Sequence, residues 1–184
     1  MFDAILTPEQ ILLRDEVRAF VKGVPRQLIL DMDADRVRYP RQYVHDLARA
    51  NLLGLRFPAK VGGRGLGWSD EIVALEEVGI LGTSLACLYS LPSIVGEALH
   101  VFGTPEQKAR WLPPMQRFEQ IGSWALTEPL VGSGAARGLQ TTATRQGDTW
   151  VLNGAKRWSG NATFAHVNVV WARDVGDNQV KGFL

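Results

Sequence analysis

The sequence predicts an α+β fold, in which an N-terminal all-α helical bundle precedes the first strands of an incomplete β-barrel or sandwich. Apolar residues recur at helical spacing over the first two thirds of the chain, and one helix-start motif occurs there twice. From Ser123 onward, apolar and polar residues alternate with a period of two, which is typical of strands. We therefore expect a helical domain at residues 1–122 and a partial β-domain at residues 123–184.

The composition excludes several classes of protein. The formal net charge is +1 with acids and bases interleaved, so nothing indicates a nucleic-acid or anionic-membrane partner. Cys87 is the only cysteine, which excludes a disulfide framework; it lies in an apolar run and is expected in the core. No metal site is expected, because the three histidines lack ligand spacing: His45, His100 and His166.

Neither a secretory signal nor a membrane span is expected. The N-terminus has no basic segment followed by an apolar stretch. The uncharged run from Val78 to Gly96 is long enough to cross a bilayer, but it contains many small and polar residues. It is expected to form one buried helix, or two that meet near Gly82.

Start and stop signals place the helices. Residues 7–10 read Thr-Pro-Glu-Gln, which supplies an N-cap hydroxyl, a proline in the first turn and a capping box. Residues 104–107 repeat these four letters, and Ser69 is expected to cap another helix. The expected helices start after Thr7, cover Arg26–Arg36 and Arg41–Leu53, run from Ser69 to Phe102 with a possible break, and run from Thr104 to Trp111, where Pro113-Pro114 ends the helix.

The strands follow from alternation and turn signals. Gln146-Gly147-Asp148 separates two strand-like runs, and Asn153-Gly154, the commonest two-residue hairpin pair, follows them. Val167, Val169 and Phe183 are expected to leave apolar edges exposed, so we expect the chain to self-associate. The expected strands are Ser123–Thr127, Leu139–Arg145, Thr149–Asn153, Ala155–Trp158, Val167–Arg173 and Val180–Leu184.

Two motifs in this order carry a resemblance to a known family. Residues 125–133 read Ala-Leu-Thr-Glu-Pro-Leu-Val-Gly-Ser, and residues 152–158 read Leu-Asn-Gly-Ala-Lys-Arg-Trp. Together with the helical region before them, they resemble the acyl-CoA dehydrogenase and oxidase superfamily. The runs at 141–144 and 156–161 are most similar to its glutaryl-CoA dehydrogenase and short-chain acyl-CoA oxidase branch.

The resemblance implies an FAD site. Backbone groups of Leu126 and the amide and hydroxyl of Thr127 would face the pyrimidine edge of the flavin, where negative charge develops during reduction. Trp158 would cover part of the isoalloxazine ring. The implied cofactor-binding residues are Trp124, Ala125, Leu126, Thr127, Gly132, Ser133, Trp158, Ser159 and Gly160.

The resemblance also implies an acyl-CoA substrate that loses an α-proton to a carboxylate and a β-hydride to the flavin. Ser133 would lie near the CoA portion. Leu85 and Ala86 occupy the positions where glutaryl-specific members have Arg-Ser, so a terminal carboxylate on the substrate would lack its partner. The electron acceptor would be an electron-transfer flavoprotein or, in an oxidase, oxygen.

The resemblance implies that the catalytic glutamate lies in a C-terminal helical domain, for which we expect no counterpart in this chain. We therefore assign no catalytic residue and expect the chain to be inactive alone, as the N-terminal portion of a dehydrogenase. Its partner would be another copy or a complementary C-terminal chain. The alternatives are an oxidase fragment and a non-catalytic remnant or interaction module. The expected location is the cytoplasm, or the mitochondrion or peroxisome in a eukaryote.

Overall fold

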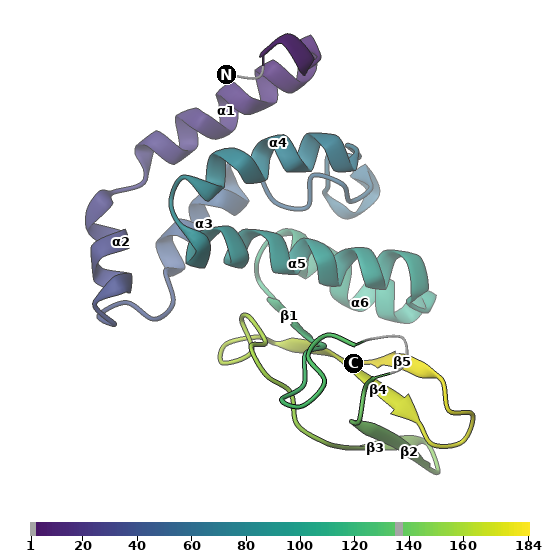
Figure 1. Cartoon of the computed structure of the whole chain (residues 1–184). Coiled ribbons are helices and arrows are strands. Elements are labelled where there is room, and N and C mark those ends of the chain that lie inside the picture. The colour runs from purple at the N-terminus through teal and green to yellow at the C-terminus, as the bar shows by residue number, and fades with distance from the viewer. Residues whose placement is uncertain (1–2, 135–137) are drawn as a thin grey trace. The chain divides into compact units, whose positions relative to one another are not determined.

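The computed structural model describes residues 3–134 and 138–184 of the chain. It divides into two compact units, a helical one at Met1–Gln120 and a sheet-containing one at Ile121–Leu184 (Figure 1). The α+β class and its order along the chain are therefore confirmed. The domain boundary at 122/123 stays a prediction.

The helical unit opens on a helix whose start was predicted correctly. Thr7 accepts a hydrogen bond from the Gln10 N–H, and the Gln10 side chain closes the capping box; the same arrangement recurs at Thr104 and Gln107. Two short 3₁₀ turns accompany the helices. In chain order the elements are η1 Asp3–Ile5, α1 Pro8–Gly23, α2 Arg26–Asp33, α3 Arg41–Arg49, η2 Ala59–Val61, α4 Trp68–Gly79, α5 Thr83–Phe102 and α6 Pro105–Gln116.

Four helix boundaries differ from the prediction. Helices α2 and α3 end at Asp33 and Arg49, before the predicted ends at Arg36 and Leu53. Gly67, rather than Ser69, is the N-cap of α4, because the Asp70 carboxylate accepts the Gly67 N–H at 2.8 Å. Helix α6 continues through Pro113 and Pro114 to Gln116. Its last turn holds because the two proline carbonyls accept N–H groups from beyond the helix and because Leu112, Met115 and Gln116 are buried.

Helices α4 and α5 meet near Gly82. Of the two predicted alternatives, two helices rather than one continuous helix are therefore confirmed. Gly82 adopts a φ of +102°, which favours glycine, and α5 begins at the next residue. In the described ranges, α5 is the one helix long and apolar enough to cross a membrane by length and composition. A core helix of a soluble protein meets the same two criteria, and eight residues of α5 are buried in this fold.

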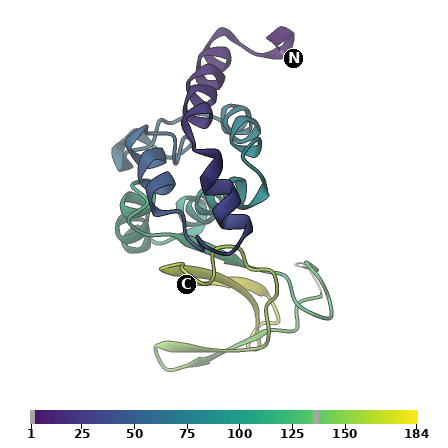
Figure 2. The same ribbon diagram turned by 90° about the vertical axis from the view of Figure 1, so that its left-hand side faces the viewer.

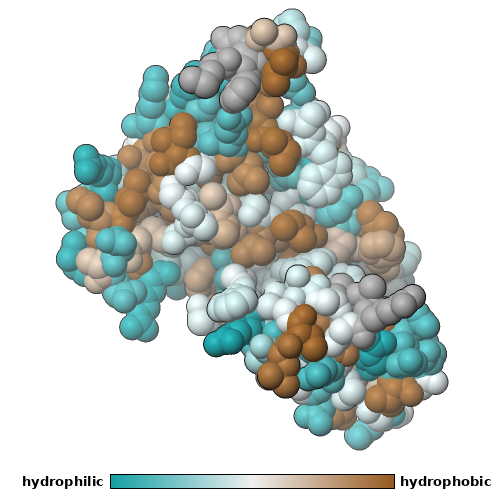
Figure 3. All heavy atoms as spheres, in the orientation of Figure 1, coloured by the Kyte–Doolittle hydropathy of each residue, from teal (hydrophilic) through white to brown (hydrophobic). Residues whose placement is uncertain are grey.

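The prediction for Cys87 is wrong, because its side chain is exposed. The buried face of α5 includes Leu85, Leu88 and Tyr89, and Cys87 lies off that face. Exposed apolar residues also occur elsewhere on the helices, and Figure 3 shows brown residues interspersed with teal ones on one face. Scattered exposed apolar side chains of this kind are normal on a protein surface.

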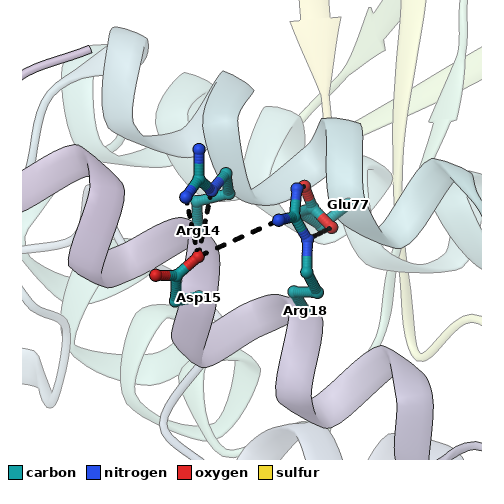
Figure 4. A network of polar contacts seen from close by, with 4 residues as sticks. All are labelled: Arg14, Asp15, Arg18 and Glu77. Atoms are coloured by element: carbon teal, nitrogen blue, oxygen red, sulfur yellow. Dashed lines mark hydrogen bonds and ion pairs between the residues drawn. The ribbon is translucent and has the colours of Figure 1, made fainter. Parts of the chain in front are cut away.

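Buried and half-buried ion pairs join the helices of this unit. Arg18 on α1 binds Glu77 on α4 through two hydrogen bonds, of 3.0 and 2.6 Å, and Arg14 and Asp15 lie beside them (Figure 4). Arg56 precedes α4, is almost fully buried, and pairs with Glu71 on α4 and with Glu97 on α5. Each pair therefore compensates a buried charge, which is the Glu77 carboxylate in the first pair and the Arg56 guanidinium in the others.

The sheet unit is built around its longest strand, β4 (Val167–Asp174). Strand β1 (Gly122–Ala125) and strand β2 (Thr142–Gln146) pair with it in parallel, and β5 (Val180–Phe183) pairs with it antiparallel. Strand β3 (Thr149–Asn153) forms a hairpin with β2. Because only two residues of β2 pair with β4, the hairpin extends beyond the rest of the sheet (Figure 2).

Two strand predictions are wrong. Residues 155–158 form no strand, so Asn153-Gly154 joins no hairpin. The turn predicted at Gln146-Gly147-Asp148 is confirmed, since β2 and β3 are joined at Gly147-Asp148. Val167 and Val169 are buried, and they pair with Gly122 and Trp124 of β1. The side chains of these two valines therefore provide no exposed apolar surface for self-association.

Two helical glycines provide a test of the helical core. A Cβ on Gly96 would lie 1.8 Å from the ring of buried Phe57, whereas a Cβ on Gly79 would meet no atom within 4 Å. We expect Gly96→Ala to lower the free energy of unfolding by about 1–3 kcal/mol through overpacking. The matched control Gly79→Ala should leave it unchanged or raise it by up to about 1 kcal/mol. Urea denaturation followed by circular dichroism measures both, and equal effects would contradict this packing.

Candidate functional site

The nine residues predicted to bind a cofactor all belong to the sheet unit. Trp124 and Ala125 end β1, and Leu126 and Thr127 follow that strand directly. Gly132 and Ser133 are exposed at the end of the next turn. The other three lie after β3 in a segment without regular structure: Trp158, Ser159 and Gly160.

Two hydrogen bonds bring the two groups of residues together. The Lys156 ammonium donates to the Leu126 carbonyl at 3.0 Å, and the Arg157 N–H donates to the Thr127 carbonyl at 2.8 Å. The segment 156–158 therefore lies beside residues 126–127, although about 30 residues separate them in the sequence. This contact also explains why residues 155–158 form no strand with β3, since their polar groups are used here instead.

The Glu128 carboxylate anchors the site. Its Oε1 accepts the Thr141 N–H at 2.9 Å and the Lys156 ammonium at 2.9 Å, and its Oε2 accepts the Gln140 N–H at 2.7 Å. The residue is 4% exposed. One side chain therefore ties the segment after β1 both to the chain leading into β2 and to the segment after β3.

These contacts keep Glu128 ionised. Burial alone would raise its pKa, but the hydrogen bonds from Thr141, Lys156 and Gln140 outweigh burial and lower the pKa from 4.5 to about 2. A carboxylate with this pKa and with three donors already bound is a poor proton acceptor. Its geometry is that of a structural anchor.

A tight turn follows the anchor. The backbone groups of Glu128 and Gly132 exchange two hydrogen bonds, of 2.9 and 3.1 Å, which close residues 128–132 into a loop. Gly132 adopts a φ of +60°, which favours glycine, and a Cβ there would meet nothing within 4 Å. The glycine is thus required by the backbone conformation, and it leaves the adjoining Ser133 exposed.

Trp158 is unusual in both exposure and backbone conformation. Its side chain is 81% exposed, and its φ of +56° is rare for a bulky residue. The Arg157 guanidinium carbon lies 5.1 Å from the centre of the indole ring. A strained backbone that presents a large aromatic surface to solvent is a feature typical of ligand sites.

Two backbone donors complete the site. Within residues 3–134 and 138–184, the N–H groups of Leu126 and Thr127 donate to no backbone or side-chain acceptor. Both residues are half-buried, so these donors are only partly open to water. With the indole of Trp158 in the same unit, they can bind a flat ligand whose edge carries acceptor atoms or developing negative charge.

Leu85 and Ala86, the predicted substrate residues, belong to α5 in the other unit. Leu85 is 2% exposed and Ala86 is half-buried. Their role stays a prediction.

Sequence reasoning missed the residues that assemble the site. Glu128 was assigned only to a motif, and no role was given to Lys156 or Arg157. The signal that could have found them is the position of charge in the two motifs, since one carries a glutamate next to the site threonine and the other a lysine two residues before the site tryptophan. Nothing local in the sequence indicates that these two charges meet.

Comparison with known proteins decides the family. The family description "Acyl-CoA dehydrogenase, N-terminal domain" matches residues 7–119, and "Acyl-CoA dehydrogenase, middle domain" matches residues 123–184. The chain belongs to the acyl-CoA dehydrogenase family. The predicted resemblance is thereby confirmed at the level of the family.

Individual acyl-CoA dehydrogenases agree with this assignment. The short-chain specific acyl-CoA dehydrogenase of Clostridium acetobutylicum is 31% identical over 99% of this chain and 48% of its own length. A glutaryl-CoA dehydrogenase structure from Mycobacterium smegmatis is 33% identical, with a TM-score of 0.87 over 99% of this chain and 46% of that one. A second such structure, in complex with FADH2, has a TM-score of 0.88 at 25% identity, over 99% of this chain and 46% of that one.

The chain spans about half the length of the curated relatives it matches. Its two units correspond to the N-terminal and middle domains of the acyl-CoA dehydrogenase family.

The lowered pKa of Glu128 predicts how the free energy of unfolding of this chain depends on pH. Since folding lowers its pKa from 4.5 to about 2, its stabilisation is fully present above pH 4.5 and is lost as the pH falls toward 2. A shift of this size corresponds to about 3 kcal/mol at neutral pH. We expect Glu128→Gln to remove this amount at pH 7 and to approach the wild type near pH 2.

Urea denaturation followed by tryptophan fluorescence measures these stabilities. Asp177→Asn serves as the control, because Asp177 also pairs with a lysine of the sheet unit but is 48% exposed. A control that lost as much stability as Glu128→Gln, or a Glu128→Gln effect independent of pH, would contradict the anchoring role.

Proposed function

We propose that this chain is the N-terminal portion of an FAD-dependent acyl-CoA dehydrogenase and that it supplies the flavin-edge side of the active site. The substrate would be an acyl-CoA thioester, which is oxidised between its α and β carbons. FAD would supply the two-electron acceptor for this oxidation. The observation that carries the proposal concerns the N–H groups of Leu126 and Thr127, which find no acceptor among the described residues and lie in the same unit as the exposed indole of Trp158.

The residues of this chain have distinct roles in the proposal. The N–H groups of Leu126 and Thr127 would bind the pyrimidine edge and stabilise negative charge there. Trp158 would cover an aromatic face and exclude water from it. Ser133, exposed beyond the tight turn, would contact the CoA portion of the substrate.

Four glutamates that are held in ion pairs are unsuited to abstract a proton. Glu128 has three hydrogen-bond donors and a pKa of about 2. In the helical unit, Glu71, Glu77 and Glu97 each bind a buried or half-buried arginine. We therefore assign the general base to no described residue of this chain, and we propose that a complementary C-terminal segment or chain provides it.

The electron acceptor distinguishes the enzymatic alternatives. By the resemblance, many dehydrogenases of the family have a threonine at the position of Gly160. The oxidase-like branch, like this chain, offers only a backbone N–H there. We favour a dehydrogenase that passes electrons to an electron-transfer flavoprotein. Formation of hydrogen peroxide by the assembled enzyme would indicate the oxidase instead.

Flavin retention tests the proposal directly. The purified chain is incubated with excess FAD and desalted, and its visible absorption spectrum is recorded. Retained flavin absorbance is expected, because the described donors and the indole of Trp158 belong to this chain. A colourless protein would count against an FAD site formed by this chain alone and would favour an interaction module that needs a partner.

A variant at Trp158 makes the same test quantitative. Since stacking on an exposed aromatic ring contributes on the order of 1 kcal/mol or more, Trp158→Ala is expected to weaken FAD binding about tenfold. Quenching of flavin fluorescence measures the Kd. Val175→Ala is the matched control, because Val175 is an exposed apolar residue in the turn after β4. Equal Kd values for Trp158→Ala and the wild type would contradict the assignment of the indole.

A further inference from the structure

We infer that Lys156 is a positioning residue for the flavin edge, because its bond to the Leu126 carbonyl fixes the direction of the Thr127 N–H. The inference rests on the proposed function for the identity of the ligand. The orientation of the N–H group can be tested without any ligand.

The geometry of the peptide bond carries the first step. Leu126 C=O and Thr127 N–H belong to one planar trans peptide, in which the two groups point in opposite directions. The Lys156 ammonium holds the carbonyl at 3.0 Å, so the N–H must point away from Lys156. In the part of the chain that the structure describes, this N–H finds no acceptor.

The ammonium is itself held in place. It lies 2.9 Å from Glu128 Oε1, and the side chains of Lys156 and Glu128 are 12% and 3% exposed. A lysine held at both a carbonyl and a buried carboxylate loses most of its rotational freedom. Because the carboxylate compensates its charge, Lys156 acts chiefly by orienting and polarising the peptide.

The next peptide shows why the effect concentrates on Thr127. The Arg157 N–H fixes the Thr127 carbonyl at 2.8 Å, and the N–H on the other side of that peptide, from Glu128, donates to Gly132. The donor of this second peptide is thus used inside the protein. The donor fixed by Lys156 is left for a ligand.

Two substitutions separate positioning from general stabilisation. Lys156→Met and Glu128→Gln both remove the pairing of the ammonium with a carboxylate, but only Lys156→Met removes the bond to the Leu126 carbonyl. The matched control is Lys181→Met, because Lys181 also binds carboxylates in the sheet unit, but these belong to Asp174 and Asp177 and lie outside residues 126–128. All three are compared with the wild type by amide NMR and by FAD titration.

The expected results differ between the variants. Lys156→Met should shift the Thr127 amide resonance, lower its order parameter and weaken FAD binding about tenfold, since a hydrogen bond to a charged group is lost. Glu128→Gln should change FAD binding less than Lys156→Met does, and Lys181→Met should not change it. If Lys156→Met folds but binds FAD as tightly as Glu128→Gln does, the inference is wrong and the proposed function stands.

Measurements on the unaltered chain keep the inference testable if Lys156→Met does not fold. A positioned Thr127 amide should have an order parameter near that of rigid backbone, about 0.85, although it donates to no acceptor among the described residues. A value below about 0.6 without ligand would overturn the inference. Failure of the wild type to bind FAD, together with a rigid Thr127 amide, would instead contradict the proposed function and leave the orienting role of Lys156 intact.

Discussion

The buried carboxylate of Glu128 is the contact on which the candidate site depends. It collects donors from Gln140, Thr141 and Lys156, which lie on two different segments. Removing a carboxylate from water is costly unless its oxygens are bound, so these donors must stay in place while Glu128 is buried. The lysine that binds this carboxylate also donates to the Leu126 carbonyl, and so the anchor and the proposed ligand edge share one ammonium group.

Local chemistry explains which parts of the fold could be predicted from the sequence. The capping boxes at Thr7 and Thr104 involve residues three apart, and the structure confirms both. Helix α6 was predicted too short because tertiary burial of Leu112 and Met115 outweighs the helix-breaking tendency of Pro113 and Pro114. The Asp70 side chain, inside α4, accepts the N–H of Gly67 and makes that residue the N-cap. The sequence alone does not show whether Ser69 or Asp70 supplies the capping side chain.

The site was predictable only in part, and the physical reason is similar. The family motifs indicated nine residues, and the structure brings Leu126 and Thr127 beside the segment that carries Trp158. The strand predicted for residues 155–158 is wrong. The alternation of apolar and polar residues carries no information on the distant partners of this segment, which are the Leu126 carbonyl and the buried Glu128 carboxylate. The pairing of Lys156 with Glu128 spans 28 residues and leaves no periodic trace in the sequence.

The same contacts separate binding from proton transfer. An anchor must stay ionised, and the donors around Glu128 lower its pKa to about 2; a general base at neutral pH needs a pKa much nearer 7. One carboxylate cannot meet both requirements in one environment. Glu128 is therefore unsuited to abstract a proton, because the same hydrogen bonds that make it an anchor keep it ionised. A reaction at the proposed flavin edge therefore needs a general base from a segment that Glu128 does not contact.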